Sequence, residues 1–227
     1  MTFSIVARCQ QTGQLGVGAA TAMVGVGKLV AHAQANVGAA ASQAMMNPYL
    51  AFDGLRGLDR GADAPATLRQ LVEADPGREG RQFGLVDAHG RSASHTGSLP
   101  EDWKGHLTGD GYAAQGNRLA GPDVLNAAVD AYLSDPQRPL VERLLEALKA
   151  GEAAGGDTKG HRSAGITVVD TEEYPLWDLR IDTAASPLEE LYANYIEFSE
   201  DLLPQVKMLP TRDNPLGGFD YGHSSGI

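Results

Sequence analysis

The chain has 227 residues, with a hydrophobic content of 42% and a charged content of 21%, which is ordinary for one large globular domain with a full core. Its formal net charge of -11 argues against binding to nucleic acid, whose phosphates need basic patches, and against binding to an anionic membrane surface. Acidity favours solubility, but it does not define a function.

Alternating β-rich segments predict antiparallel strands, and the first two form a hairpin around the turn at 11–14. The second of these strands is rich in glycine and alanine, which would let another layer approach closely. A Gly-rich bend at 24–28 leads to the third strand. The predicted strands span residues 3–8, 15–21, 37–42, 81–87, 92–96, 112–115, 163–170 and 176–182.

Helical spacing of apolar residues predicts five helices, each of which begins at or beside a proline. They begin near residues 48, 64, 121, 139 and 187. The chain order is strands, two helices, strands, two helices, strands and a last helix, without regular β-α-β alternation. This order is typical of an α+β domain whose helices cover stacked sheets.

We expect one main domain over residues 1–185 and a C-terminal segment over residues 186–227 that packs on the same domain or on a partner subunit. The segment begins as an acidic amphipathic helix and becomes rich in proline and glycine after Pro204, so its end is expected to be extended or mobile. A homodimer or a higher homo-oligomer is expected, because two-fold symmetric assemblies are the commonest kind.

Cys9 is the only cysteine, which excludes an internal disulfide. No signal peptide precedes the first strand, and no apolar run approaches the roughly 18 residues of a membrane span. We therefore expect a cytoplasmic protein with no membrane partner.

The first strand begins at Thr2, directly after Met1. Methionine is normally removed when a residue as small as threonine follows it, and removal would leave Thr2 with a free α-amine beside its own hydroxyl. That pairing is a nucleophile with a built-in base, the N-terminal threonine variant of hydroxyl activation. If Met1 is retained, the nitrogen is part of a peptide bond and Thr2 is an ordinary residue at the start of a strand.

A series of short motifs extends over most of the chain, from about Thr2 to Asp182. The segments are 2–7, 13–18, 75–79, 84–87, 95–97, 109–117, 119–122, 155–157 and 178–182. In this order they resemble the bacterial domain-of-unknown-function family 1028, which is grouped with the N-terminal-nucleophile (Ntn) hydrolases. The resemblance implies a four-layer αββα sandwich with the nucleophile at the start of a strand in a central sheet. It implies no particular substrate.

Two positions depart from the proteasome-like Ntn members, which carry an Asp at the end of the second strand and a Lys in the third. Here the second strand ends without an acid, at Thr21 and Ala22, and no lysine lies between Leu29 and Gln43. Lys28 comes just before that stretch and either reaches the site or is a solvated loop residue. Without this charged pair, activation of Thr2 would need other groups.

Four amide side chains are candidates for the lining of a substrate site. Two flank the end of the third strand, and two belong to a segment that follows Gly111, where a glycine-framed backbone can approach a ligand closely. Amides suit an oxyanion hole or a neutral polar substrate, and the alternative is that each stabilises a turn. Ser4 would lie on the same strand face as Thr2. The four amides are Gln43, Asn47, Gln115 and Asn117.

The histidines show no close metal-ligand spacing, so neither a metal nor another cofactor is expected. His95, near a strand end, is either a general base or a structural histidine. Asp157 lies with Lys159 and His161 in a polar, Gly-rich loop, which is a candidate lining for a cleft.

The sequence leaves two alternative functions. The first is an Ntn-type amidohydrolase that acts on a small amide or peptide-like molecule, with Thr2 as the nucleophile. The second is a non-catalytic binding or assembly protein that keeps the sandwich without the active pair, and the missing Asp and Lys favour it. A closed pocket at Thr2 would favour the second function, and an open polar cleft would favour the first.

Overall fold

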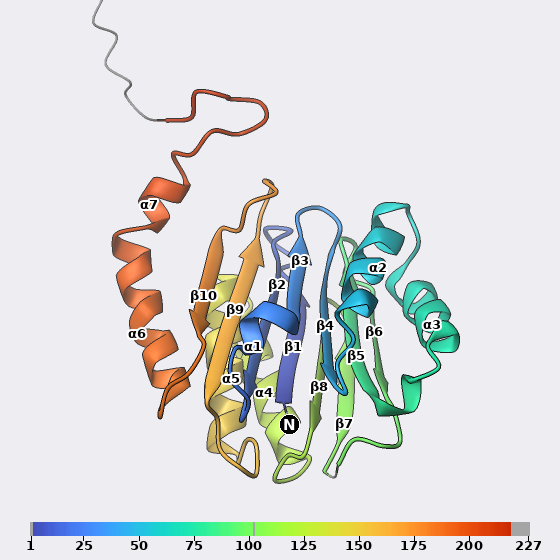
Figure 1. The fold of residues 1–227 in the computed structure, drawn as a ribbon. Helices are drawn as coiled ribbons and strands as arrows, with labels where there is room; N and C mark the ends of the chain where they lie inside the picture. Colours follow the sequence, from blue (N-terminus) through green and yellow to red (C-terminus); the bar gives the residue numbers. More distant parts are fainter. Residues whose placement is uncertain (1, 102, 219–227) are drawn as a thin grey trace, which may run out of the picture.

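The computed structural model of the chain describes residues 2–101 and 103–218. Its strands are β1 (Thr2–Arg8), β2 (Leu15–Thr21), β3 (Ala31–Gln34), β4 (Gly38–Ala44), β5 (Arg81–Asp87), β6 (Ser92–Thr96), β7 (Gly105–Gly109), β8 (Tyr112–Asn117), β9 (Ser163–Val169) and β10 (Trp177–Ile181). They form two antiparallel sheets, one with the order β10-β9-β2-β1-β8-β7 and one with the order β3-β4-β5-β6 (Figure 1). The strand β1 therefore lies inside the larger sheet, between β2 and β8.

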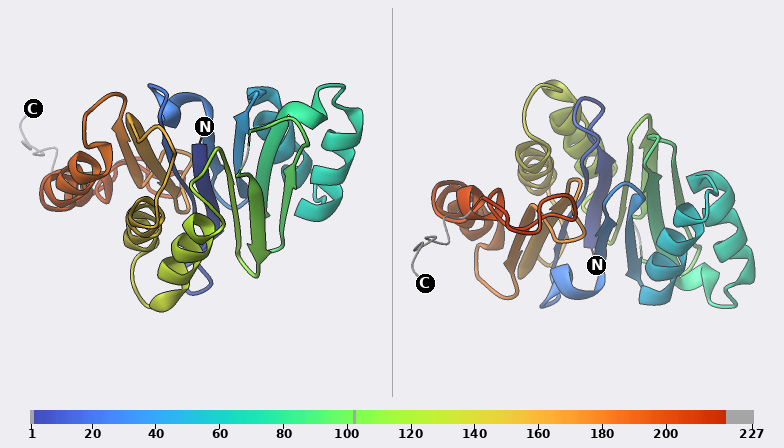
Figure 2. Two further views of the ribbon diagram at one scale, coloured as in Figure 1. Left: turned by 90° about the horizontal axis from the view of Figure 1, so that it is seen from below. Right: turned by 90° about the horizontal axis from the view of Figure 1, so that it is seen from above.

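Two pairs of helices, α2 with α3 and α4 with α5, pack on the outer faces of the two sheets (Figure 2). Helices α4 and α5 share one apolar cluster with β1, β9 and β10, whereas α2 and α3 share another with β4 and β5. A third cluster, between these two, joins the inner faces of the sheets. The helices are α1 (Val26–Leu29), α2 (Pro48–Asp59), α3 (Ala64–Ala74), α4 (Asp123–Ser134), α5 (Leu140–Ala153), α6 (Pro187–Glu200) and α7 (Leu203–Val206), with a short 3-10 helix η1 (Arg78–Gly80).

The two-residue period of β1 sends alternate side chains to different layers. Phe3 and Ile5 belong to the cluster under α4 and α5. Val6 belongs to the cluster between the sheets, and Ser4 bonds across to a β4 side chain. Because both faces of the strand are covered, β1 is buried along nearly its whole length. The same alternation brings Thr2 to the space between the sheets.

Side chains cap the two helices that cover the smaller sheet. Asn47 precedes α2, and its Oδ1 accepts a hydrogen bond from the N–H of Tyr49 at 3.1 Å. Asp63 precedes α3, and its Oδ1 accepts a hydrogen bond from the N–H of Ala66 at 2.7 Å. A proline follows within the first two positions of each helix, where its missing N–H costs nothing. The sequence therefore specifies both helix starts locally.

The predicted strands and helices are present, with ends that shift by a few residues. The sequence does not predict β3 or β7. Each of these strands is at the edge of its sheet and pairs on one side only, with β4 and with β8 respectively. Their half-exposed residues include no alternating pattern of large apolar side chains, so pairing with a neighbour makes them strands.

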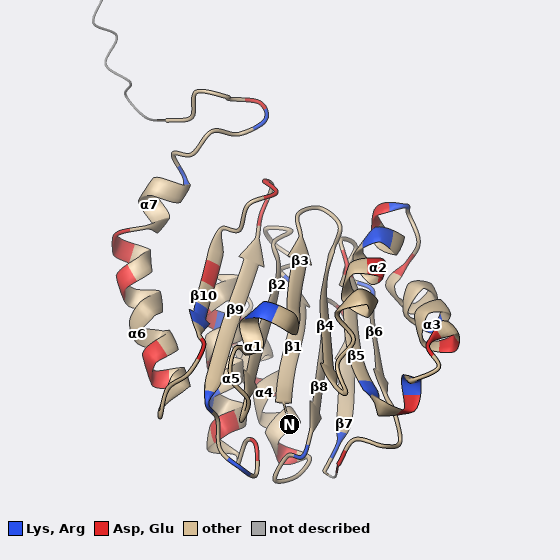
Figure 3. Ribbon diagram, in the orientation of Figure 1, with Lys and Arg blue, Asp and Glu red and all other residues tan. Residues whose placement is uncertain are grey.

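The C-terminal segment begins with α6, whose Leu188 and Leu191 are buried in the same cluster as α5 and β10. Other residues of α6 are acidic, and Figure 3 shows these charges along the helix. No helix among residues 2–101 and 103–218 is both long and apolar enough to cross a membrane. Residues 219–227, the end of the segment expected to be extended, lie outside the described residues.

The interface between the sheets changes character from one end of β1 to the other. Apolar side chains fill it around Val6 and Val17, but amide and hydroxyl side chains fill it around Ser4 and Thr2. Gly84 makes room for this polar region, because a Cβ there would overlap the amide of Gln115. That amide cannot move aside cheaply, since it is fully buried and hydrogen-bonded on both its oxygen and its nitrogen.

We expect Gly84→Ala to destabilise the fold by about 1–3 kcal/mol, because the added methyl group overpacks the interface between the sheets. Gly18→Ala is the matched control, because Gly18 is also a buried strand glycine but its added Cβ would lie 3.4 Å from the nearest Leu148 atom. Urea unfolding of both variants tests this. Equal stability of the two variants would contradict the tight packing of Gln115 on Gly84.

Candidate active site

Thr2 begins β1 at one end of the larger sheet, opposite Thr21 of β2 and Asn117 of β8. Its hydroxyl donates a hydrogen bond to the Thr21 hydroxyl at 3.1 Å. The Thr21 hydroxyl also accepts a bond from the N–H of Met23 at 3.3 Å. Thr2 is only 6% exposed. The strand register and a second hydroxyl therefore hold the predicted nucleophile in place.

Gln43 of β4 connects Thr2 to the other sheet. Its Nε2 donates to the main-chain oxygens of Thr2 and Gln115, each at 3.2 Å, and to Gln82 Oε1 at 2.7 Å. Its Oε1 accepts from the Ser4 hydroxyl at 2.6 Å. The predicted site residue Gln43 is thus close to Thr2, but its amide hydrogens are already bonded to protein oxygens.

Gln82 of β5 is the centre of the same network and is not predicted from the sequence. Its Oε1 also accepts from Asn117 Nδ2 at 2.9 Å, and its Nε2 donates to Gly116 O at 2.7 Å. The sequence feature that could have indicated Gln82 is its position two residues before Gly84, on the strand face opposite Phe83. Polar residues on a fully buried strand need partners from a facing strand.

Gln115 of β8 completes the network. Its Nε2 donates to the Ser4 hydroxyl at 2.7 Å, and its Oε1 accepts from Ser94 at 3.2 Å. The structure therefore brings three of the four predicted amides, Gln43, Gln115 and Asn117, to the Thr2 end of the interface. Their side chains are hydrogen-bonded within the protein. Because buried polar groups must be bonded, such a network makes the interface specific and rigid.

Two hollows lie on either side of Ala44 at the same end of the sheets. The first, which we call the Thr2 pocket, has a volume of about 80 Å³. It is lined by Thr2, Thr21, Met23, Val24, Gly25, Val26, Leu29, Val30, Gln43, Ala44 and Met46. The second, which we call the Asn117 pocket, has a volume of about 300 Å³. It is lined by Ala44, Met45, Leu99, Pro100, Glu101, Asn117 and Arg118, and Glu101 and Arg118 form an ion pair.

The remaining predicted residues lie elsewhere. Asn47 caps α2 and contributes its side chain to neither pocket. Lys28 on α1 is exposed and forms an ion pair with Asp182 at 3.6 Å, so it does not line the Thr2 pocket. His95 bonds through Nε2 to the main-chain oxygen of Arg78 at 2.9 Å. Each of these side chains contacts another part of the chain, and none of them lines either pocket.

The Asp157 loop closes the end of the larger sheet beside Thr2. Asp157 Oδ2 accepts from the N–H of Ala22, just after β2, at 3.3 Å, and its main chain forms a β-bridge with Leu119, just after β8. Since β1 begins between β2 and β8, the loop extends across the end of the strand that carries Thr2. Asp157 is 3% exposed. A buried carboxylate therefore lies at the end of the larger sheet where β1 begins.

His161 holds the Asp157 loop in place. Its Nε2 accepts from the N–H of Asp157 at 3.2 Å, so Nδ1 carries the ring proton of the neutral form and donates to Glu152 at 2.8 Å. Asp157 Oδ1 accepts from the N–H of Lys159 at 2.9 Å. The sequence identifies this loop as polar but does not place it beside Thr2, because the contact joins residues more than 130 positions apart.

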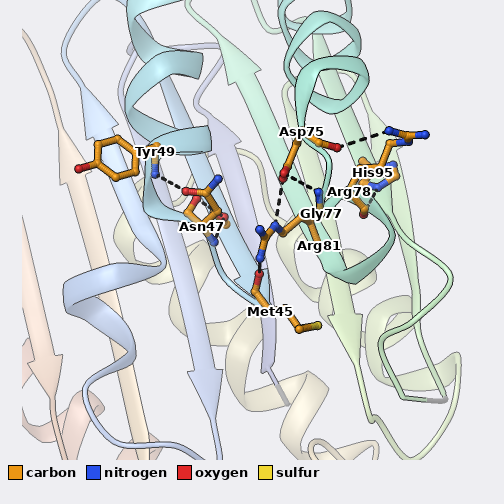
Figure 4. A network of polar contacts seen from close by, with 9 residues as sticks. Met45, Asn47, Tyr49, Asp75, Gly77, Arg78, Arg81 and His95 are labelled. Carbon is orange, nitrogen blue, oxygen red and sulfur yellow. Dashed lines mark hydrogen bonds and ion pairs between the residues drawn. The ribbon is translucent and has the colours of Figure 1, made fainter.

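A second polar cluster fixes the turn after Ala44 (Figure 4). Arg81 donates to the main-chain oxygen of Met45 and forms an ion pair with Asp75 at 3.0 Å. Burial alone would raise the pKa of Asp75, but the N–H of Gly77 and the Arg81 guanidinium outweigh it and hold the pKa below its usual range. Asp75 thus connects the loop before η1 to the turn that separates the two pockets.

No group of three or more potential metal-ligating side chains is close enough to bind an ion within residues 2–101 and 103–218. Cys9 lies at the opposite end of β1 from Thr2, where its thiol donates to Gln11 Oε1 at 3.3 Å. The Thr2 end of the sheets is therefore the place where the predicted reactive group, the buried acid and two pockets coincide.

A family model and a solved structure agree on the family of this chain. The model of the family of unknown function DUF1028 matches residues 2–191. The crystal structure of SPO2555 from Silicibacter pomeroyi, also matched by the DUF1028 family model, gives a TM-score of 0.90 at 31% identity, covering 100% of this chain and 99% of that chain. The chain therefore belongs to this family of unknown function.

A more distant structure, Anbu (ancestral beta-subunit) from Yersinia bercovieri, gives a TM-score of 0.42 at 11% identity, covering 92% of this chain and 98% of that chain. A similarity at this level carries no argument about fold or function. No curated protein matches the chain.

We expect Asp75→Asn to lower the free energy of unfolding at neutral pH by about 1 kcal/mol, because Arg81 loses its charged partner. The lowered pKa of Asp75 makes this contribution complete above the usual carboxyl range, and it is lost as the pH falls through the lowered pKa. Wild type and variant should therefore converge in acid. Urea unfolding across the acid range tests this, with Asp53→Asn as the control, because Asp53 pairs with Arg56 at the surface, where an ion pair contributes little. A constant difference at all pH values would contradict the ionic origin.

Proposed function

We propose that this protein is an N-terminal-threonine amidohydrolase on a four-layer αββα sandwich of the Ntn type. The two helix pairs on opposite outer faces and the packed inner faces of the sheets support this architecture. The resemblance of its sequence motifs to a family grouped with the Ntn hydrolases supports the reaction class. The substrate is a small amide or peptide-like molecule.

One observation carries the proposal. The Thr2 hydroxyl lies at the start of a central strand, 3.1 Å from a second hydroxyl, and lines a pocket, while the buried Asp157 lies across the same strand end. Ser4 offers a useful contrast on the same face of β1. Its hydroxyl is enclosed between Gln43 and Gln115 and lines neither pocket. Thr2 is the hydroxyl of this face with access to a ligand.

The chemistry requires removal of Met1, which frees the α-amine of Thr2. An α-amine titrates near neutral pH, so its neutral form takes the hydroxyl proton as Thr2 Oγ1 attacks the amide carbonyl. The carbon–nitrogen bond breaks, the leaving amine takes the proton from the α-ammonium, and an ester to Thr2 remains. Water, activated by the same amine, then releases the carboxylic acid.

Neighbouring groups would act by positioning Thr2. Gln43 holds the Thr2 main-chain oxygen and so fixes the direction in which the residue leaves the sheet. Asp157 favours the ammonium form of the amine that develops during attack, because a nearby carboxylate stabilises a positive charge. These two residues take the place of the Asp and Lys that proteasome-like members carry.

The alternative is a non-catalytic binding or assembly protein on the same scaffold. The amide network favours it, because Gln43 has no unused polar group for a reacting carbonyl. The small volume of the Thr2 pocket favours it as well. The two functions differ in whether Thr2 can be acylated.

We expect wild-type protein to lose Met1 and to gain a single adduct at Thr2 when treated with an activated ester, as measured by intact mass and peptide mapping. Thr2→Ala should lose Met1 equally, because alanine is also small, and should gain no adduct. Thr108→Ala, which removes an exposed threonine on β7, should be labelled like wild type. Retention of Met1 without an adduct in wild type would establish the non-catalytic alternative instead.

We expect Asp157→Asn to move the pH dependence of Thr2 labelling toward lower pH by about one unit, since loss of the carboxylate lowers the pKa of the α-amine. A purely structural role would change the labelling rate equally at every pH. Asp110→Asn removes an exposed carboxylate that bonds Gln10 and is the control. Thermal unfolding of each variant checks that the fold persists. An unshifted profile in folded Asp157→Asn would exclude this positioning role.

A further inference from the structure

The mouth of the Thr2 pocket is formed by exposed apolar side chains. Met23, Val24, Leu29 and Met46 are 60%, 55%, 47% and 41% exposed, and all four line the pocket. We call them the apolar rim. Single exposed hydrophobic residues are normal on a protein surface, but a group gathered around one concave site indicates binding of an apolar group.

The Thr2 pocket contains no charge. None of the described residues that line it is Asp, Glu, Lys or Arg. Figure 3 shows that α1 is uncharged apart from Lys28, which is paired with Asp182 outside the pocket. An ionised group at the far end of an acyl chain would lose hydration there without a charged side chain of the lining to pair with, so an uncharged chain is favoured.

The Asn117 pocket, unlike the Thr2 pocket, is lined by charged and polar side chains. Glu101 and Arg118 line it, together with the amide side chain of Asn117. It is the larger of the two, at about 300 Å³, and Ala44 is common to both pockets. A molecule that spans Ala44 would therefore meet an apolar, uncharged subsite beside Thr2 and a larger polar subsite beyond it.

The volume of the Thr2 pocket limits what fits. A water molecule needs about 10–15 Å³ of cavity, so about 80 Å³ accommodates roughly five to eight non-hydrogen atoms. That matches an acyl group of about four to six carbons with its carbonyl. Met23 and Met46 are flexible and polarizable, which suits an unbranched aliphatic chain.

We propose that the Thr2 pocket is an acyl site, and that the substrates are amides that join a short, uncharged aliphatic acid to a larger polar amine. This inference rests on the proposed function. The acyl group lies among the apolar rim, its carbonyl faces Thr2, and the amine lies in the Asn117 pocket. Hydrolysis breaks the amide bond, adds water, and releases an aliphatic carboxylic acid and the amine.

The first test measures binding without turnover, on the Thr2→Ala protein. Butanamide, pentanamide and hexanamide should bind progressively more tightly, by about fourfold for each added methylene group, and chains beyond six or seven carbons should gain no more. Succinamate, which carries a charge at the far end of a chain of similar length, should not bind. Ligand-observed NMR titration measures both. Affinity that does not depend on chain length, or preference for succinamate, would overturn the inference.

Two variants assign the binding to the rim. Met46→Ala enlarges the pocket and should shift the preferred chain length upward by one to three carbons. Val24→Asp should weaken hexanamide binding at least tenfold. Leu133→Ala truncates a comparably exposed residue on α4 and should change neither result. Unchanged chain-length preference in both rim variants would place the binding elsewhere and overturn the proposal.

The same variants separate three outcomes. If wild type hydrolyses amides but prefers charged or polar acyl groups, the result supports the hydrolase and contradicts the acyl site. If Thr2→Ala binds aliphatic amides with the expected dependence on chain length but wild type hydrolyses none, the result supports the acyl site and contradicts the hydrolase. If Val24→Asp converts a dimer to a monomer in light scattering and no amide binds, the rim is a contact between two copies and the acyl site falls.

Discussion

The cost of burying polar groups between two sheets is the constraint on which the rest of this molecule depends. Gln43, Gln82 and Gln115 are essentially inaccessible to water, so each must find its partners in the protein. Gln43 does so by bonding main-chain oxygens of the larger sheet and Gln82 of the smaller one. A slip of one residue in β1 would replace Ser4 by Phe3 or Ile5 at this interface and leave several amides unbonded. The network therefore fixes the register and the distance between the sheets.

This constraint also distinguishes the two hydroxyl residues of β1. Ser4 is surrounded by amides at 2.6 and 2.7 Å, and its hydroxyl could not leave without creating two unbonded groups. Thr2 is held by its main-chain oxygen, which accepts from Gln43, and its hydroxyl bonds the Thr21 hydroxyl at the longer distance of 3.1 Å. The backbone and the hydroxyl of Thr2 are thus held by different bonds.

The sequence predicts those parts of the fold that depend on local patterns. Period-two alternation places Ser4 and Thr2 on one face, and Asn47 with its proline marks the start of α2. It does not predict β3 and β7, because edge strands depend on a neighbour more than on their own residues. The motifs predict the family, which the comparisons confirm. They do not distinguish amides that bind each other from amides that bind a ligand.

The position of Asp157 beside Thr2 has a different origin and lies further from sequence reasoning. The loop reaches the end of β1 only because β8 and β2 end there together, and that meeting is a property of the strand order. Local residues specify a Gly-rich polar loop, and tertiary structure gives the loop its place. The position of this carboxylate at the end of the larger sheet is therefore visible only in three dimensions.

The two pockets at the Thr2 end of the sheets follow from how the neighbouring strands leave the sheets. Ala44 at the end of β4 and Arg118 just after β8 have φ values of 68° and 57°, in the left-handed region that costs a non-glycine residue about 1–3 kcal/mol. Arg81 holds the Met45 oxygen just after the first, and Glu101 pairs with the second. Both chains thereby turn away from the start of β1, and both pockets lie at these turns. The contacts of Arg81 and Arg118 offset the strain of these two turns and so keep both pockets in place.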